Sequence, residues 1–248
     1  MAGALSVQIA TNLANDYFDF KKGTDSKERI GPVRVTQSGL IKPSIVLLAS
    51  LFLFAVTAYI AYLLYQRGGQ PIAIIGIASI LSGILYTAGP LALGYLGLGD
   101  FFVLIFFGPV AVAGTYYVQS LEINMAVILS GLGPGLISVA ILTINNLRDI
   151  DTDRKSNKRT LAVRFGRSFA LNEFLFCILT ASLLPSFIYF LIEDHIAILA
   201  TNLTVLLSIP VIKTVLTKID GPSLNNALAY TGRLLLVYSL LFSIGWIL

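Results

Sequence analysis

Cysteine, histidine and charged residues are scarce in this chain of 248 residues, and each scarcity argues against a particular kind of site or class of protein. The one cysteine, Cys177, lies in an apolar run, which argues against a disulfide and against a thiolate metal site. The one histidine, His195, falls in a short loop and is interpreted as an interfacial loop residue. Only 12% of the residues are charged, whereas soluble domains carry about a quarter. The composition therefore excludes an ordinary soluble domain.

Long apolar runs dominate what is present. The chain is 56% hydrophobic, with a mean hydropathy of +0.83. The runs are continuous rather than alternating, so they predict helices and not the strands of a barrel. We expect an all-α, multi-span transmembrane helical bundle that forms one integral membrane domain over residues 1–248. Residues 1–13 are too short to cross a bilayer and predict a partial first helix. Seven full spans are predicted, at residues 44–65, 72–88, 101–118, 125–148, 169–192, 196–215 and 224–248.

The basic residues indicate which way the chain crosses the bilayer. Loops 21–43, 89–100, 149–167 and 213–222 share one side and hold most of the seventeen Lys and Arg residues, whereas the opposite loops hold Arg67. By the positive-inside rule the basic side is cytoplasmic. Topology therefore explains the net charge of +4 better than nucleic-acid binding does, and we expect a lipid bilayer and no nucleic acid as partner.

Two clusters of carboxylate and carboxamide side chains lie on this cytoplasmic side. In the first, Asn12, Asp16 and Asp19 are spaced i, i+4 and i+7, with Asn15 one turn before Asp19. The second follows an apolar run. If its helix continued, Asn145, Asp149 and Asp153 would share one face, with Asn146 and Asp151 as neighbours. Each cluster alone is equally consistent with helix capping, interfacial solvation or a charged end of a span. Two clusters on one side of the membrane favour a binding site.

Carboxylate and amide oxygens are hard ligands that suit Mg²⁺, which is often held by a few carboxylates together with substrate phosphates. Two acidic faces across a cavity could hold two or three Mg²⁺ ions against one diphosphate. Lys and Arg pair with diphosphate oxygens, although each basic residue alone is also explained by the positive-inside rule. Lys158 and Arg159 are the first choices among the flanking basic residues, which are Lys22, Arg29, Arg34, Arg154, Lys158, Arg159 and Arg164.

A diphosphate on an allylic lipid is a leaving group. Metal ions and basic side chains neutralise its developing charge, which allows the C–O bond to ionise. The resulting carbocation must be kept away from water, and a cavity among apolar helices does that. Aromatic faces can stabilise the cation, although most membrane aromatics serve packing or interfacial anchoring. The candidates are Tyr17, Phe18, Tyr86, Tyr95, Tyr116 and Tyr117.

Several motifs together resemble the UbiA-type intramembrane aromatic prenyltransferases. They are NDYFD at 15–19, RIGPVRVTQSG at 29–39, YTAGP at 86–90, YLGLGD at 95–100, NNLRDIDTDR at 145–154 and KRTLAVRFG at 158–166. The GPxRVTQSG run is typical of the branch that prenylates 1,4-dihydroxy-2-naphthoate. The resemblance covers essentially the whole chain.

The resemblance implies a nine-helix bundle around a central cavity, here N-terminally shortened because the family's first helix is missing. It implies transfer of a polyprenyl group from polyprenyl diphosphate to 1,4-dihydroxy-2-naphthoate with loss of CO₂, giving demethylmenaquinone. By position, Asp19, Asp149 and Asp153 are expected to be catalytic. The expected Mg²⁺ ligands are Asn15, Asp16, Asp19, Asn145, Asp149 and Asp153, and the expected diphosphate contacts are Lys22, Arg29, Arg34, Arg154, Lys158 and Arg159.

Two other interpretations remain open at this point. One is a related prenyltransferase that acts on another aromatic acceptor, such as 4-hydroxybenzoate or homogentisate. The other is a divalent-cation transporter, which would place its acids near mid-membrane, whereas here they cluster at one face beside long basic loops. The expected location is the plasma or inner cell membrane, with a multi-pass chain and an active site that faces the cytoplasm.

Overall fold

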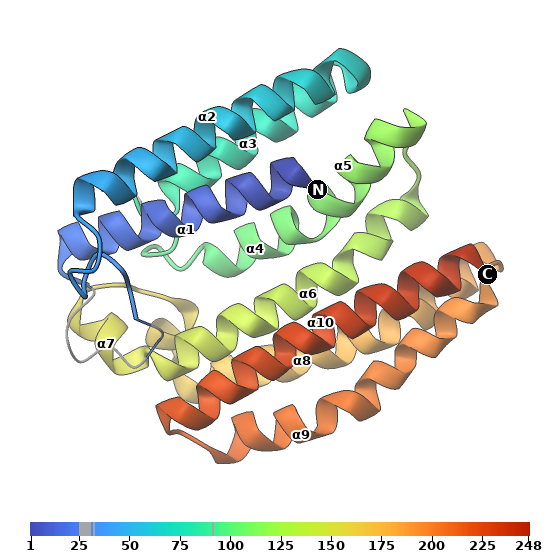
Figure 1. Cartoon of the computed structure of the whole chain (residues 1–248). Coiled ribbons are helices and arrows are strands. Elements are labelled where there is room, and N and C mark those ends of the chain that lie inside the picture. Colours follow the sequence, from blue (N-terminus) through green and yellow to red (C-terminus); the bar gives the residue numbers. More distant parts are fainter. Residues whose placement is uncertain (25–30, 32, 91) are drawn as a thin grey trace. The chain divides into compact units, whose positions relative to one another are not determined.

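The computed structural model describes residues 1–24, 31, 33–90 and 92–248, and all of the regular elements in this part are helical. Figure 1 shows the helices in chain order. They are α1 (Ala2–Lys22), α2 (Pro43–Gly68), α3 (Gln70–Leu85), α4 (Gly99–Phe107), α5 (Pro109–Ser120), α6 (Met125–Arg148), α7 (Ile150–Lys155), α8 (Leu161–Ile192), the 3₁₀ helix η1 (Ile196–Leu203), α9 (Thr204–Thr217) and α10 (Gly221–Ile247). The all-α prediction is confirmed.

The chain divides into two compact units. The first contains Met1–Gly99, Tyr117–Leu121 and Asp151–Thr160. The second contains Asp100–Tyr116, Glu122–Ile150 and Leu161–Leu248. The part of the second acidic cluster that carries Asp153 therefore belongs to the same unit as the first acidic cluster.

In the first unit, α1 packs along α2 and α3 (Figure 1). The contact is close because α1 presents Ala10 and Ala14, which are buried against Phe54 of α2. Small residues let helix backbones approach, and polar side chains then join them. Ser50 Oγ donates to the Ala10 carbonyl at 2.9 Å, and the hydroxyls of Ser6 and Thr57 lie 2.9 Å apart. This packing holds the end of α1, where the first acidic cluster lies.

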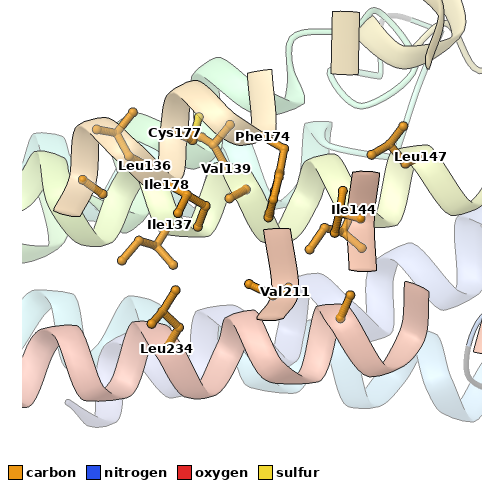
Figure 2. Packing of buried hydrophobic residues seen from close by; sticks show 14 of the residues in the cluster. Leu136, Ile137, Val139, Ile144, Leu147, Phe174, Cys177, Ile178, Val211 and Leu234 are labelled. Carbon is orange, nitrogen blue, oxygen red and sulfur yellow. The ribbon is translucent and has the colours of Figure 1, made fainter. Parts of the chain in front are cut away.

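In the second unit, α6 packs against α8 and α10, and these helices share an apolar core. Figure 2 shows Ile137 and Ile144 of α6, Phe174 and Ile178 of α8 and Leu234 of α10 within this core. These side chains recur at helical spacing on the faces that meet, which is the pattern expected of packed amphipathic helices. The core fixes the C-terminal end of α6, where the second acidic cluster begins.

Six stretches of the described chain are long and apolar enough to cross a membrane. They are Pro43–Gly68, Gly99–Ser120, Met125–Arg148, Leu161–Ile192, Ile196–Thr217 and Gly221–Ile247. Several expose large apolar side chains, including Phe52 at 66% and Phe190 at 77%, as expected of surfaces that face lipid. The protein is therefore a multi-pass membrane protein. The seventh predicted span, 72–88, corresponds to α3, whose 16 residues fall short of the roughly 20 that a span needs.

The structure corrects several predicted boundaries. The single span at 101–118 is divided at Gly108, since Pro109 begins a new helix, α5. The span at 196–215 starts as the 3₁₀ helix η1 before α9. The polar loop at 149–167 contains the short helix α7 and the start of α8, which breaks at Gly166, where φ is +82°. His195 lies in the short loop between α8 and η1, as predicted, and its ring stacks on Trp246.

Candidate functional site

The first acidic cluster lies in the last three turns of α1. The helix ends after Lys22, where Gly23 takes a left-handed conformation with φ of +71° and its N–H bonds to the Asp19 and Phe20 carbonyls. Asp16 and Asp19 are buried, whereas Asn12 is exposed. The two aspartates of the predicted face are thus buried, whereas Asn12, one turn before Asp16, is exposed.

Residues that follow α1 in the chain contact the side chains of Asn15, Asp16 and Asp19. Asn15 Oδ1 accepts a hydrogen bond from Thr87 Oγ1 at 2.8 Å. Asp16 Oδ2 accepts from the Val35 N–H at 3.2 Å. Asp19 Oδ1 accepts from the Tyr95 hydroxyl at 2.8 Å, and Arg34 Nη2 lies 3.5 Å from Asp19 Oδ2. The cluster is therefore oriented by segments that follow it in the chain by 15 to 80 residues.

One carboxylate oxygen of the first cluster lacks a hydrogen-bond partner among the described residues. Asp16 Oδ1 is buried and has no hydrogen-bond partner within the described ranges 1–24, 31, 33–90 and 92–248. A buried carboxylate oxygen without a partner is costly, because it has lost its water and gained nothing in return. A cation at this oxygen would remove that cost, so the donor set of the first cluster fits a hard divalent metal ion.

The ammonium group of Lys22 makes two hydrogen bonds to backbone carbonyls. Its Nζ donates to the carbonyls of Thr87 at 2.6 Å and Gly89 at 3.2 Å, and it lies 4.2 Å from the centre of the Tyr95 ring. Burial lowers the pKa of Lys22, and the negative charge of Asp19 opposes that shift. Lys22 thus helps to hold the 86–95 loop against α1, and its predicted contact with diphosphate stays a prediction.

The second acidic cluster begins where α6 ends. The helix does not continue past Arg148, because Asp149 is its C-cap with φ of −101° and ψ of 9°. The condition for a single continuous face from Asn145 to Asp153 is therefore not met. Instead, Arg148 organises the helix end. Its guanidinium donates to Asn145 Oδ1 at 2.7 Å, to Asn225 Oδ1 at 2.7 Å, and to both carboxylate oxygens of Asp149.

Residues 151–160 carry the rest of this cluster and belong to the first unit. Asp153 is buried, and Lys158 Nζ lies 3.4 Å from its Oδ1. By contrast, Asp151 and Arg154 form a solvated pair, with side chains 89% and 61% exposed. The Arg159 N–H donates to the Tyr95 carbonyl at 3.0 Å. Tyr95 therefore links the segment that carries Asp153 and Lys158 to the segment that carries Asp19.

Each predicted catalytic carboxylate has a basic partner, as three ion pairs show. Arg34 pairs with Asp19, Arg148 with Asp149 and Lys158 with Asp153. No group of three or more His, Cys, Asp and Glu side chains suited to a metal ion occurs within the residues that the structure describes. A Mg²⁺ ion held by one or two carboxylates plus phosphate oxygens does not need such a group. Arg29, a predicted diphosphate contact, lies outside the described residues.

Sequence reasoning missed several residues of this network. Arg148 stands between Asn145 and Asp149 in the sequence, and its spacing of three from Asn145 was a usable signal. Thr87 and Asn225 are separated from their partners by more than 70 residues, so no local pattern could reveal them. A pair of acids deeper in the second unit was also missed. Glu173 accepts from Thr143 Oγ1 at 3.4 Å, and Asp100 is buried nearby in electrostatic range.

Comparison with known proteins identifies the family of the chain. Residues 1–246 match the UbiA prenyltransferase family. The chain is 36% identical over 251 residues to the 1,4-dihydroxy-2-naphthoate octaprenyltransferase of Haemophilus influenzae, with 96% of this chain and 80% of that protein covered. It is also 36% identical over 250 residues to the Escherichia coli protein of the same name, at the same coverage.

A more distant similarity extends to animals. The chain is 31% identical over 255 residues to the human UbiA prenyltransferase domain-containing protein 1, with 98% of this chain and 70% of that protein covered. The family match and the bacterial relatives cover nearly all of the present chain. The protein is therefore a member of the UbiA prenyltransferase family.

Proposed function

We propose that this enzyme transfers a polyprenyl group from polyprenyl diphosphate to 1,4-dihydroxy-2-naphthoate, with loss of CO₂, and gives demethylmenaquinol, which becomes demethylmenaquinone when two electrons are removed outside this reaction. The names of the bacterial relatives, at 36% identity over 96% of the chain, support the acceptor. The observation that carries the reaction type is the set of three acid–base pairs, Asp19–Arg34, Asp149–Arg148 and Asp153–Lys158.

These pairs suit a ligand that brings both signs of charge. A diphosphate bound with divalent cations offers anionic oxygens to the arginines and lysine and cations to the carboxylates. Each ion pair could then exchange its partner without leaving an unpaired charge behind, which a buried site would not tolerate. Lys158 is held by Asp153 at a loose 3.4 Å and Arg34 by Asp19 at 3.5 Å, so both can be redirected at small cost.

The chain's own residues have three tasks in this reaction. Arg34, Lys158 and Arg159 would stabilise the charge that develops on the leaving diphosphate, since Arg and Lys donate charge-assisted hydrogen bonds to phosphate oxygens. The apolar helices would exclude water from the allylic cation. The acceptor ring would then attack the allylic carbon. The C–O bond breaks first, and diphosphate leaves with its electron pair. A ring electron pair then forms the C–C bond to the cation, and CO₂ leaves while the electrons of its bond to the ring restore the aromatic system.

Mg²⁺ is the proposed cofactor, with Asn15, Asp16, Asp19, Asn145, Asp149 and Asp153 as the residues that would hold it. The buried Asp16 Oδ1 supports this choice, together with the hard oxygen donors of both clusters. When bound, the metal would neutralise charge on the diphosphate and favour ionisation of the C–O bond.

The proposed location is the plasma or inner cell membrane, with the acidic clusters at the cytoplasmic face. The support is the charge asymmetry of the loops, since the long loops beside both clusters carry most of the Lys and Arg residues. A thiol-reactive or protease-accessible tag placed after Lys155, read in intact cells and in inverted vesicles, would test this orientation.

The reaction is tested with the protein in nanodiscs or native membranes. We would supply Mg²⁺, polyprenyl diphosphates of several lengths and each of three acceptors, and identify the products by mass. Demethylmenaquinol formed from 1,4-dihydroxy-2-naphthoate, detected as such or as demethylmenaquinone after oxidation in air, is the expected result. Prenylated 4-hydroxybenzoate or homogentisate instead would overturn the acceptor. No prenyl transfer, with Mg²⁺ flux into proteoliposomes, would favour a divalent-cation transporter.

A further inference from the structure

Tyr95 contacts both segments on which the proposed diphosphate site depends. Its hydroxyl donates to Asp19 Oδ1 at 2.8 Å and lies 2.6 Å from Thr24 Oγ1. Its backbone carbonyl accepts the Arg159 N–H at 3.0 Å. Asp19 ends the first acidic cluster, and Arg159 follows directly after Lys158. One residue in the loop between α3 and α4 therefore joins two segments that lie 140 positions apart in the sequence.

Backbone hydrogen bonds fix residues 93–95. The Leu93 N–H bonds to the Leu85 carbonyl, and the Gly94 N–H bonds to the Tyr86 carbonyl, both at 3.0 Å. A Cβ at position 94 would lie 3.1 Å from the Tyr86 ring, which is a tight contact, so glycine suits this close approach. The Tyr95 N–H bonds to the Ala92 carbonyl at 2.9 Å. The hydroxyl thus projects from a fixed backbone and can define the position of its partner.

The two oxygens of Asp19 are held in different ways. Oδ1 receives the short, neutral hydrogen bond of Tyr95, whereas Oδ2 faces the more distant guanidinium of Arg34 at 3.5 Å. A phenol at neutral pH has no charge to compensate, so it can orient a carboxylate without competing for its negative charge. Arg34 can leave when a cation arrives. Groups that hydrogen-bond to ligating carboxylates commonly fix them in this manner.

We propose that Tyr95 is the positioning residue of the first acidic cluster: its hydroxyl fixes Asp19 so that the carboxylate is presented to the divalent cation that accompanies the diphosphate. The inference rests on the proposed function, because it assumes that Asp19 binds a cation. It adds a residue in the 86–98 loop whose effect on the metal passes through Asp19 and not through direct contact.

The side chain of Tyr95 has a second task that can be separated from the first. Its ring lies under the ammonium of Lys22, with 4.2 Å between Nζ and the ring centre. Tyr95→Phe keeps that ring and removes the bond to Asp19. Tyr95→Leu removes both. If the hydroxyl is what positions Asp19, Phe and Leu should weaken metal binding alike, while Phe alone should preserve the stability of the loop.

The experiment measures binding apart from turnover. The full chain in nanodiscs is titrated with Mn²⁺ in the presence of a non-ionising thiolo-diphosphate analogue of the prenyl donor, and free Mn²⁺ is followed by electron paramagnetic resonance. We expect Tyr95→Phe to weaken Mn²⁺ binding by about tenfold, the lower end of the loss typical for such partners of metal ligands. The matched control is Tyr62→Phe, since Tyr62 is exposed on α2 in the same unit.

Turnover gives a second readout. We expect Tyr95→Phe to raise the Mg²⁺ concentration needed for half-maximal activity by a similar factor and to recover most of the parent kcat at saturating Mg²⁺. A purely structural role would lower the melting temperature and the amount of folded protein but leave the Mg²⁺ requirement unchanged, and that result would overturn the inference.

Asp19→Asn separates this inference from the function on which it rests. If Asp19→Asn binds Mn²⁺ as tightly as the parent, the proposed metal site is wrong and Tyr95 has nothing to position. If Asp19→Asn loses binding while Tyr95→Phe matches Tyr62→Phe, the metal site stands and the role of Tyr95 is refuted. Loss in both variants, with the control unaffected, supports the two together.

Discussion

The guanidinium of Arg148 binds the carboxylate of Asp149 through two hydrogen bonds, from Nε to Oδ1 at 2.8 Å and from Nη2 to Oδ2 at 2.6 Å. The side chains are 2% and 11% exposed, so the pair is buried. The same guanidinium also reaches Asn145 and Asn225. This arrangement fixes the orientation of the Asp149 carboxylate, one of the proposed metal ligands, and it joins three side chains at the end of α6 through Arg148.

Arg148→Gln should lower the free energy of unfolding by about 3 kcal/mol, because it removes the counter-charge of a buried carboxylate and the two further hydrogen bonds to Asn145 and Asn225. Arg148→Lys should recover only part of this loss, since an ammonium cannot bind both oxygens in the planar, bidentate geometry. Thermal unfolding in nanodiscs measures the change.

The matched control is Arg154→Gln, which removes the exposed ion pair with Asp151. Exposed pairs contribute about 0–1 kcal/mol, so Arg154→Gln should unfold close to the parent temperature. Equal destabilisation by Arg148→Gln and Arg154→Gln would contradict the structural role assigned to the buried pair.

Asp149→Asn should reduce prenyl transfer by more than about 100-fold at every Mg²⁺ concentration, because an amide cannot supply the charge that a metal ligand provides. Asp151→Asn serves as the comparison, because its side chain is 89% exposed and solvated. Steady-state rates at several Mg²⁺ concentrations measure both variants, with melting temperatures to show that each is folded. Near-normal turnover in folded Asp149→Asn would refute the metal assignment.

Asp220 caps the last helix, and its effect depends on pH. Its Oδ1 accepts from the Ser223 N–H at 2.9 Å, and the hydrogen bonds from Ser223 lower the pKa of this carboxyl below its usual value of 3.8. A lowered pKa in the folded state contributes stability that is fully present above pH 3.8 and is lost as pH falls through the depressed pKa.

Hydrogen exchange of the first amides of α10 at pH 6 and pH 3 reports this effect locally. In the parent, protection should fall on acidification. Asp220→Asn should keep the cap, since Asn is an equally good N-cap, and should lose the pH dependence. Asp220→Ala should show low protection at both pH values. Unchanged protection in Asp220→Ala would show that the cap does not stabilise this helix end.

The sequence predicted the helices well because their cause is local. Apolar runs of about twenty residues can satisfy their backbone in a bilayer only as helices, and six of the seven predicted spans correspond to helical stretches long enough to cross. The polar ends were also predictable, because Asn15 and Asp19 lie one turn apart in any helix. The central cavity and the roles of the individual site residues stay predictions.

Other features arise from contacts that no local pattern encodes. The break at Gly108 reflects close approach of Gly131 and Gly135 of α6, where an added Cβ on either would meet backbone atoms within 2.7 Å. The bond from Tyr95 to Asp19 spans 76 residues. The prediction that Asn145, Asp149 and Asp153 would share one helical face depended on a helix that continues. Because α6 ends at Arg148, with Asp149 as its C-cap, that condition is not met. Periodicity predicts which residues share a helix, not where tertiary contacts interrupt it.

The close packing of Gly133 of α6 against Tyr238 of α10 gives a prediction about stability. A Cβ at Gly133 of α6 would lie 2.0 Å from the Tyr238 hydroxyl oxygen and 2.4 Å from its ring. Tyr238 is 1% exposed on α10 and has little room to move. Gly133→Ala should therefore destabilise the protein by about 1–3 kcal/mol through overpacking, as measured by thermal unfolding in nanodiscs.

Two further variants decide whether this steric contact is the cause. Gly232 of α10 has nothing within 4 Å of an added Cβ, so Gly232→Ala should be neutral or slightly stabilising, because alanine favours a helix by about 1 kcal/mol over glycine. Tyr238→Leu removes the ring that Gly133→Ala would strike, so the double variant should be more stable than the sum of the two single changes predicts. Strict additivity would mean that α6 and α10 do not approach closely at Gly133, because only residues in contact show such coupling.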